Sequence, residues 1–126
     1  MLEKKILIID DEERIREIVQ VCLQDLGGWD VVTADSGQEG LVKAKTESPN
    51  AILLDVSMPD IDGFEFFDRL QQTPDLKDIP VILLTAKVLP QDRQNFERMG
   101  VKGLIAKPFN PLTLAQEVEK LLDADG

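Results

Sequence analysis

The sequence predicts an α/β fold, a doubly wound parallel sheet of five strands with five helices. Short runs rich in Ile, Val and Leu recur from one end of the chain to the other, and segments whose apolar residues have helical spacing lie between them. Strands that are buried on both faces read as continuous apolar runs of this kind. The alternation of the two patterns therefore predicts a parallel sheet with helices on both faces.

The expected strands are short and apolar, and they cover residues 6–9, 31–34, 51–54, 81–84 and 103–106. Right-handed crossover connections leave few topologies for such a chain. In open sheets of this class, ligands bind outside the carboxyl ends of the strands, where the strand order reverses. Functional residues are therefore expected directly after the strands.

The first two helices have clear sequence signals. The first carries an apolar stripe at one-sided helical spacing and ends at Gly27 and Gly28. The residues of that stripe are Ile15, Ile18, Val19, Cys22, Leu23 and Leu26. The second helix opens at Ser36, with Glu39 three residues on in a capping box, and it ends before Pro49.

The third and fourth helices differ in how strongly they are anchored. The third is expected over residues 63–72, and its predicted buried residues are Phe64, Phe67 and Leu70. The fourth lies between residues 90 and 100, and its only strong apolar anchors are Phe96 and Met99. The fourth helix is therefore expected to be less stable than the first.

The fifth helix is expected to start at Asn110, an N-cap residue that is followed by Pro111 at the first helical position. Its predicted buried residues are Leu114, Ala115, Val118, Leu121 and Leu122.

Length, charge and composition exclude several function classes. With 126 residues, the chain is expected to form one domain over residues 1–126. Its 14 basic and 24 acidic side chains leave a net charge of −10, which opposes binding to nucleic acids and anionic membranes. One cysteine and no histidine exclude a disulfide framework, His-dependent hydrolases and zinc sites built on these residues. Without a signal-peptide core or a membrane-length apolar run, an intracellular, cytoplasmic protein is expected.

Polar side chains follow four of the expected strands: Asp10 and Asp11, then Asp55, Thr85 and Lys107. The carboxyl ends of parallel strands share one edge of the sheet, so these groups are expected to meet there. Clustered carboxylates repel one another unless a cation neutralises them, and Mg²⁺ suits such an all-oxygen site. A carboxylate nucleophile beside a metal and a lysine ammonium indicates phosphoryl transfer through an aspartyl phosphate.

Each of these residues has a structural alternative when it is taken alone. Asp10 and Asp11 are typical of helix N-caps, Asp55 of a turn, and Thr85 of a strand end. Lys107 alone is typical of a solvated charge. Their joint position at one sheet edge favours the functional interpretation.

The ordered segments 8–12, 53–59, 62–63, 80–86 and 107–109 resemble the receiver domain of two-component response regulators, in particular the single-domain chemotaxis regulators. The resemblance covers essentially the whole chain. It implies a flavodoxin-like sheet of order 2-1-3-4-5 and a cytoplasmic signalling module. It also implies a histidine kinase or phosphotransfer protein as phosphodonor, and output through altered binding to a downstream protein target.

The resemblance assigns Asp55 as the phosphoacceptor and implies an Mg²⁺ site around it. Asp11 would bind the metal directly and Asp10 partly through water. Asp55 would complete the carboxylate set, and the main-chain carbonyl of Ser57 would be a further ligand.

The resemblance also implies groups that bind the phosphoryl oxygens. Lys107 would pair with Asp55 and then with its phosphoryl group, and Thr85 would donate a hydrogen bond to it. The amides of Val56 and Ala86 would lie nearby. The peptide bond before Pro108 would be cis.

The sequence departs from the family at the switch. In the family, the residue matching Thr85 moves towards the phosphoryl group while an aromatic residue on the last strand rotates inward. Here the matching position, three residues before Lys107, is Leu104. Phosphorylation does not need that ring, but the coupling of Thr85 to Leu104 has to differ. Ser57 and Lys87 hold the two positions that, in the family, tune how long the phosphoryl group stays on the acceptor. The sequence is compatible with slow and with fast dephosphorylation.

Three functions stay open at this point. The leading one is a phosphorylation-controlled signalling module whose own chemistry is limited to accepting and losing a phosphoryl group, and which is not otherwise an enzyme. The second is a receiver-like binding domain that does not use phosphate. The third is an Mg²⁺-dependent phosphatase with an aspartyl nucleophile, although Asp55 lacks a second carboxylate two residues later. Homodimers through the face from the fourth to the fifth helix are an alternative assembly.

Overall fold

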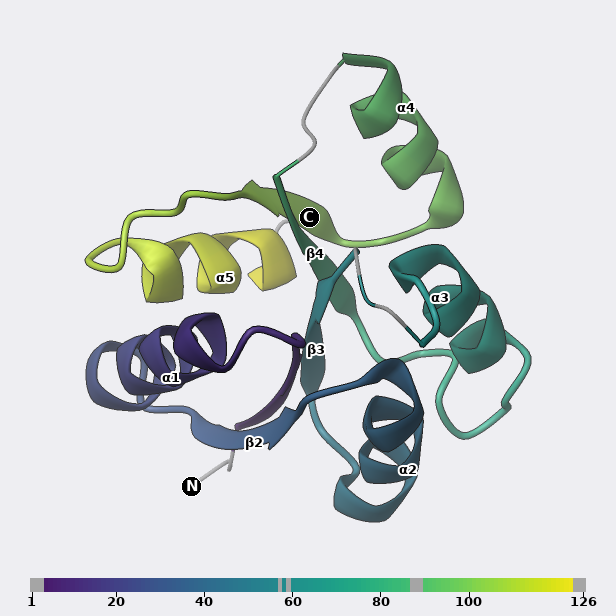
Figure 1. Cartoon of the computed structure of the whole chain (residues 1–126), viewed down its shortest axis with the longest axis horizontal. Helices are drawn as coiled ribbons and strands as arrows, with labels where there is room; N and C mark the ends of the chain where they lie inside the picture. Colours follow the sequence, from purple (N-terminus) through teal and green to yellow (C-terminus); the bar gives the residue numbers. More distant parts are fainter. Residues whose placement is uncertain (1–3, 57, 59, 87–89, 124–126) are drawn as a thin grey trace.

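The computed structural model describes residues 4–56, 58, 60–86 and 90–123, and it contains one five-stranded parallel sheet between two layers of helices (Figure 1). The strand order is β2-β1-β3-β4-β5. The order reverses beside β1, which pairs with both β2 and β3. The doubly wound α/β fold and its strand order are therefore confirmed.

Every predicted strand is present. The strands are β1 (Lys5–Ile9), β2 (Asp30–Ala34), β3 (Ala51–Asp55), β4 (Val81–Thr85) and β5 (Gly103–Ala106). β1 and β2 begin one residue earlier than predicted, and β3 and β4 end one residue later, so that Asp55 and Thr85 are the last residues of β3 and β4. Asp55 lies opposite Leu84, and Thr85 lies opposite Ala106. Pairing with the neighbouring strands therefore fixes the backbone of both polar residues.

The helices follow the strands in the expected order. They are α1 (Glu13–Val21), the π-helical turn η1 (Cys22–Leu26), α2 (Gly37–Glu47), α3 (Gly63–Gln71), α4 (Pro90–Met99) and α5 (Leu114–Asp123). In Figure 1, α1 and α5 lie on one side of the sheet, and α2, α3 and α4 lie on the other. None of the helices in the described part of the chain is both long and apolar enough to cross a membrane.

The strand side chains divide between two apolar cores. On β1, Leu7 and Ile9 pack towards α2 and α3, whereas Ile6 and Ile8 pack towards α1 and α5. All four are essentially inaccessible to solvent. Because successive strand residues point to opposite faces, a strand covered on both sides has to be apolar throughout. This is why the strands were recognisable as continuous apolar runs.

The predicted buried face of α3 is wrong at Phe64, which is 43% exposed. Phe66 is fully buried in its place, together with Phe67 and Leu70. The helix begins at Gly63 with Asp62 as its N-cap, and residues 63, 66, 67 and 70 form the i, i+3, i+4, i+7 stripe that faces the sheet. Phe64 lies at the edge of this stripe, towards α4.

The start of the last helix also differs from its prediction. Regular helix begins at Leu114, and residues 111–113 form a turn. Asn110 still organises the start, because its Oδ1 accepts from the amide of Leu112 at 2.9 Å and its carbonyl accepts from the amide of Thr113 at 3.1 Å. Both bonds lie in a tight turn that precedes the helix. The sequence pattern predicts the first helical residue, Pro111, within this turn. The expected buried residues of this helix form the core on the α1 side, although Leu121 and Leu122 are only half-buried.

Candidate functional site

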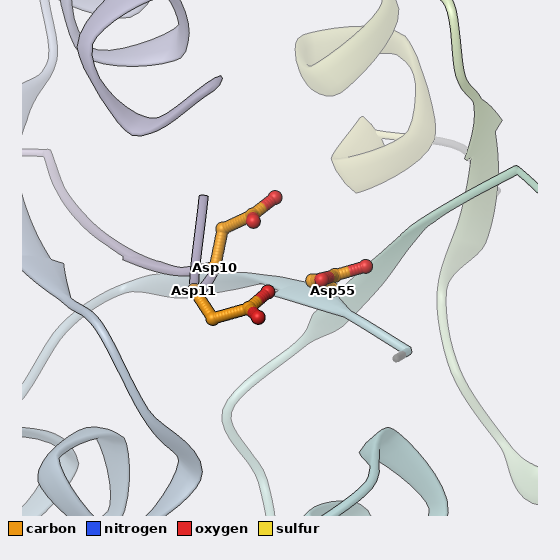
Figure 2. A group of neighbouring side chains, drawn as sticks. All are labelled: Asp10, Asp11 and Asp55. Carbon is orange, nitrogen blue, oxygen red and sulfur yellow. The ribbon is translucent and has the colours of Figure 1, made fainter. Parts of the chain in front are cut away.

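Three carboxylates meet beyond the carboxyl ends of β1 and β3, at the point where the strand order reverses. They belong to Asp10, Asp11 and Asp55, and one oxygen from each lies within 4.8 Å of the others (Figure 2). Asp10 and Asp55 are buried, whereas Asp11 is exposed. The structure thus brings together the three carboxylates that the sequence placed at this edge, with one side of the group open to solvent.

Lys107 brings a positive charge to this cluster. Its Nζ lies 3.1 Å from Oδ2 of Asp10 and 3.4 Å from Oδ1 of Asp55. Burial alone would lower the pKa of Lys107, but the Asp10 carboxylate, followed by that of Asp55, outweighs burial and raises the pKa above its usual value. The ammonium therefore stays charged between the two carboxylates at neutral pH. The expected pairing with Asp55 is present, and Asp10 is the closer partner.

Two residues outside the predicted site support Asp10. The amide of Glu12 donates to Oδ1 of Asp10 at 2.9 Å, and Nη1 of Arg16 donates to the Asp10 carbonyl at 2.6 Å. The Glu12 carboxylate also lies 3.6 Å from Nζ of Lys107. The sequence signal for these contacts is the acidic run itself, because α1 begins at Glu13, shortly after Asp10, and the start of this helix therefore lies close to Asp10. Backbone and side chain of Asp10 are thereby held in place.

Thr85 and Pro108 lie at the same edge of the sheet. Thr85 is 2% exposed at the end of β4, and its carbonyl accepts from the amide of Lys107 at 2.8 Å. This bond places Lys107 beside Thr85 as β5 ends. The Lys107–Pro108 peptide bond is cis, as expected.

The remaining predicted site residues differ in where they lie and in how far they are buried. The amide of Val56 donates to the carbonyl of Leu84 at 3.4 Å, and Ala86 is exposed directly after β4. Ser57 and Lys87 lie outside the described residues. Leu104 lies opposite Leu83 and is half-buried against the core on the α2–α4 side. It therefore occupies the predicted switch position with a purely apolar side chain.

The loop after Asp55 is attached to its own strand through Gly63. The Gly63 amide donates to the Val56 carbonyl at 2.9 Å, and a Cβ on Gly63 would lie 2.9 Å from the Cα of Val56. Backbone packed this closely has no room for a side chain. Gly63 thus allows the start of α3 to touch the residue next to Asp55.

Gly63→Ala is expected to lower the free energy of unfolding by about 2 kcal/mol, because the added methyl group meets backbone that cannot move aside without shifting Val56. Urea titration measures the effect. Gln38→Ala, at an exposed position in the first turn of α2, is the matched control and should change stability by less than about 0.5 kcal/mol. Equal stability of the Gly63 variant and the control would contradict the close packing.

The same loop is tied to α2 by Asp60. Its Oδ1 accepts from the amide of Gly37 at 3.1 Å, and its Oδ2 accepts from the amide of Gln38 at 2.9 Å. Ser36 caps the next amide, since its Oγ accepts from the amide of Glu39 at 3.1 Å. The Gln38 amide is the main cause of a lowered pKa for Asp60, with burial opposing it and the amides of Ile61 and Gly37 adding to it. Asp60 therefore joins the loop to the amino end of α2.

Asp60→Asn is expected to destabilise the fold by up to about 1 kcal/mol near neutral pH, because a neutral amide satisfies the α2 amides less well. Because the folded pKa of Asp60 lies below its usual 3.8, this stabilisation is complete above about pH 5 and is lost as the pH falls through the folded pKa. In urea titrations of the native chain and the variant from pH 7 to pH 3, the difference in stability should shrink towards the acidic end. A pH-independent difference would contradict a charge-based contribution. Asp75→Asn, at an exposed position, is the control.

Comparisons with known proteins place this chain in a family. Residues 6–119 match the response regulator receiver domain. The alkaline phosphatase synthesis transcriptional regulatory protein PhoP of Bacillus subtilis is 39% identical over 121 residues, which are 96% of this chain and 49% of that protein. The response regulator Rre1 of Synechocystis is 32% identical over 93% of this chain and 51% of its own length. The chain thus spans about half the length of these curated relatives.

The structure is similar to that of the chemotaxis response regulator CheY4 of Vibrio cholerae, with a TM-score of 0.88 and 36% identity over 95% of this chain and 99% of that one. A response regulator from Chloroflexus aurantiacus superposes with a TM-score of 0.86 and 31% identity, over 96% of this chain and 98% of its own. The fold, the acidic edge and the family match agree. The chain therefore belongs to the response regulator receiver domains, the phosphoacceptor signalling domains of two-component systems.

Proposed function

We propose that Asp55 is the phosphoacceptor and that it takes a phosphoryl group from the phosphohistidine of a histidine kinase or a phosphotransfer protein. The supporting observation is its geometry: a carboxylate 4% exposed at the switch point of the sheet, 3.4 Å from the ammonium of Lys107. A carboxylate oxygen of Asp55 forms the new bond to phosphorus. The P–N bond of the donor breaks, and the imidazole nitrogen keeps the electron pair.

The carboxylates fit a hard divalent cation, and we assign Mg²⁺ to them. Oxygen donors clustered within 4.8 Å, two of them buried, are the ligands that Mg²⁺ prefers. Asp11, Asp10 and Asp55 would hold the ion, with the main-chain carbonyl of Ser57 as a further ligand. When bound, Mg²⁺ supplies positive charge to the oxygens of the transferred group. Asp11 is the exposed member of the set and faces the side from which a hydrated ion would enter.

The remaining residues would bind the transferred group. Lys107 already bridges Asp10 and Asp55, so its ammonium is in place to pair with a phosphoryl oxygen. The hydroxyl of Thr85 would donate to a second oxygen, and the amides of Val56 and Ala86 would complete the set. In this role the Val56 amide would exchange its long bond to Leu84 for a bond to the phosphoryl group.

The output of this module is altered binding to a downstream protein target in the cytoplasm. Movement of Thr85 would be transmitted through the neighbouring strand, where half-buried Leu104 takes the place of the family's aromatic residue. Without a ring to expose or hide, Leu104 would change packing rather than surface polarity.

The chain, taken as one domain over residues 1–126, would catalyse only its own phosphorylation from a donor and its own dephosphorylation. It would not bind nucleic acid or membranes, because its net charge is −10. Its α4–β5–α5 face is the candidate surface for pairing of two copies.

Intact mass spectrometry tests the proposal. After incubation with acetyl phosphate and Mg²⁺, the protein is expected to gain one phosphoryl group, and with EDTA in place of Mg²⁺ it should gain none. Absence of an adduct under continuous donor, while Mg²⁺ titration by calorimetry shows binding, would favour the phosphate-independent binding module. Turnover of an added phosphate monoester would favour the phosphatase.

A further inference from the structure

An apolar groove of about 620 Å³ lies between α3 and α4, and Asp10, Asp11 and Asp55 are not among the residues that line it. Its apolar lining consists of Phe64, Phe67 and Met99. Phe64 is 43% exposed, and its ring stacks on that of Phe96 with a centroid distance of 5.5 Å. The stack fixes a large aromatic surface in a half-open position at the junction of the two helices. Aromatic side chains held in this way are typical anchors of protein interfaces.

The rim of this α3–α4 groove is acidic. Asp62, Glu65 and Asp68 line it, and no Lys or Arg does so among the residues that the structure describes. All three are exposed. Glu65 lies 3.5 Å from Arg69, whereas Asp62 accepts from the amide of Glu65 and Asp68 accepts from the side-chain amide of Gln72, both of which are neutral donors. The groove therefore combines an apolar floor with a negative edge.

A second groove on the same side of the molecule has the opposite charge. It lies between α2 and α3, has a volume of about 420 Å³, and its apolar lining includes Leu41, Val42 and Leu76. Its charged lining residues are Lys45 and Arg69. Both grooves are apolar, but the charged residues of the α3–α4 groove are acidic and those of the α2–α3 groove are basic. A charged partner should therefore bind one groove in preference to the other.

We propose that the α3–α4 groove binds a basic amphipathic helix of a partner protein. Phe64, Asp68 and Gln71 follow one another at helical spacing along α3, so the groove runs parallel to that helix for about two turns. A helix with apolar residues at i, i+3, i+4 and i+7 would cover the aromatic floor. Lys or Arg beside those residues would meet the carboxylates of the rim. The net charge of −10 steers a basic partner towards the chain.

This surface goes beyond the proposed phosphoryl chemistry and does not depend on it. Asp55 does not line the groove, and binding to the unphosphorylated chain tests the groove by itself. A failure of phosphorylation would leave the expected binding unchanged. A failure of binding would leave the assignment of Asp55 unchanged.

The experiment is an NMR titration of the ¹⁵N-labelled full chain with a synthetic peptide helix that carries Leu at i, i+3, i+4 and i+7 and Lys at the flanking positions. Amide shifts are expected to concentrate at the residues that line the α3–α4 groove, among them Phe64, Gln71 and Met99. A peptide of the same composition with shuffled positions has the same charge but no apolar face. It is expected to bind at least about tenfold more weakly, because contact with a buried aromatic anchor typically contributes that much to affinity.

Two pairs of variants separate the groove from general attraction to an acidic protein. Phe64→Ser should weaken binding of the Leu–Lys peptide about tenfold, whereas Val42→Ser, which removes an exposed apolar residue of the α2–α3 groove, should leave it unchanged. Asp68→Lys should weaken binding several-fold, whereas Asp25→Lys, the same charge change on η1, should not.

Three results would overturn the proposal. One is equal binding of the ordered and the shuffled peptide, with shifts spread over all acidic surfaces. Another is a Phe64→Ser variant that binds as the native chain does while keeping its spectrum. The third is a set of groove shifts that depends on protein concentration without peptide, which would assign the α3–α4 groove to a second copy of the chain.

Discussion

Asp55→Asn is expected to abolish the phosphoryl adduct formed with acetyl phosphate and Mg²⁺. An amide is a poor nucleophile, and the substitution leaves the neighbouring groups in place, because Asn has the size of Asp and Asp55 is held in the ladder opposite Leu84. The loss is therefore chemical rather than structural. Intact mass spectrometry of the variant beside the native chain measures it directly.

The matched control for this substitution is Asp68→Asn, which removes an exposed carboxylate from α3 and should leave the adduct unchanged. Thermal unfolding of both variants checks that each is folded. Persistence of the adduct in Asp55→Asn would move the acceptor to another carboxylate of the cluster, Asp10 or Asp11, and would refute the central assignment.

Lys107→Met is expected to lower the free energy of unfolding by about 3 kcal/mol in the absence of divalent cations. The ammonium lies within 3.4 Å of two carboxylates that are almost inaccessible to solvent, those of Asp10 and Asp55. Methionine keeps much of the length of the side chain but leaves two buried negative charges facing one another. Urea titration in EDTA measures the difference.

Addition of Mg²⁺ should restore part of this loss, since the ion would supply the positive charge that the variant lacks. The gain in stability with Mg²⁺ is therefore expected to be larger for Lys107→Met than for the native chain, following the linkage of binding to folding. Lys77→Met, which removes an exposed ammonium, should change stability by less than about 0.5 kcal/mol. If Lys107→Met is as stable as the native chain in EDTA, the cost of burying the ammonium cancels its attraction to the carboxylates.

The sequence predicted the strands well because each of them is buried on both faces. A strand covered by helices on two sides has to be apolar at every position, and such a run is visible without any knowledge of its neighbours. The same reasoning placed Asp10 and Asp55 at one edge, because parallel strands end on the same side. It required only the order of the elements, which the alternation of patterns supplies.

The predicted buried face of α3 was wrong at Phe64 because the local pattern of apolar residues was ambiguous. Phenylalanine occupies positions 64, 66 and 67, and two different helical faces can be drawn through these residues. The contact of Gly63 with Val56 decides between them, because it brings the first residue of the helix against the strand. Residues 66, 67 and 70 then face the sheet, and Phe64 becomes the wall of a groove.

The sequence by itself determined the fold class, the strand positions and the residues that gather at the functional edge. These depend on short-range periodicity and on chain order, both of which can be read along the chain. Only the tertiary structure decided that Lys107 lies closer to Asp10 than to Asp55, and that Asp60 caps a helix whose start lies 23 residues earlier. Such pairings depend on distances between elements, which are set by how side chains pack across the sheet and between helices, and no local pattern contains them.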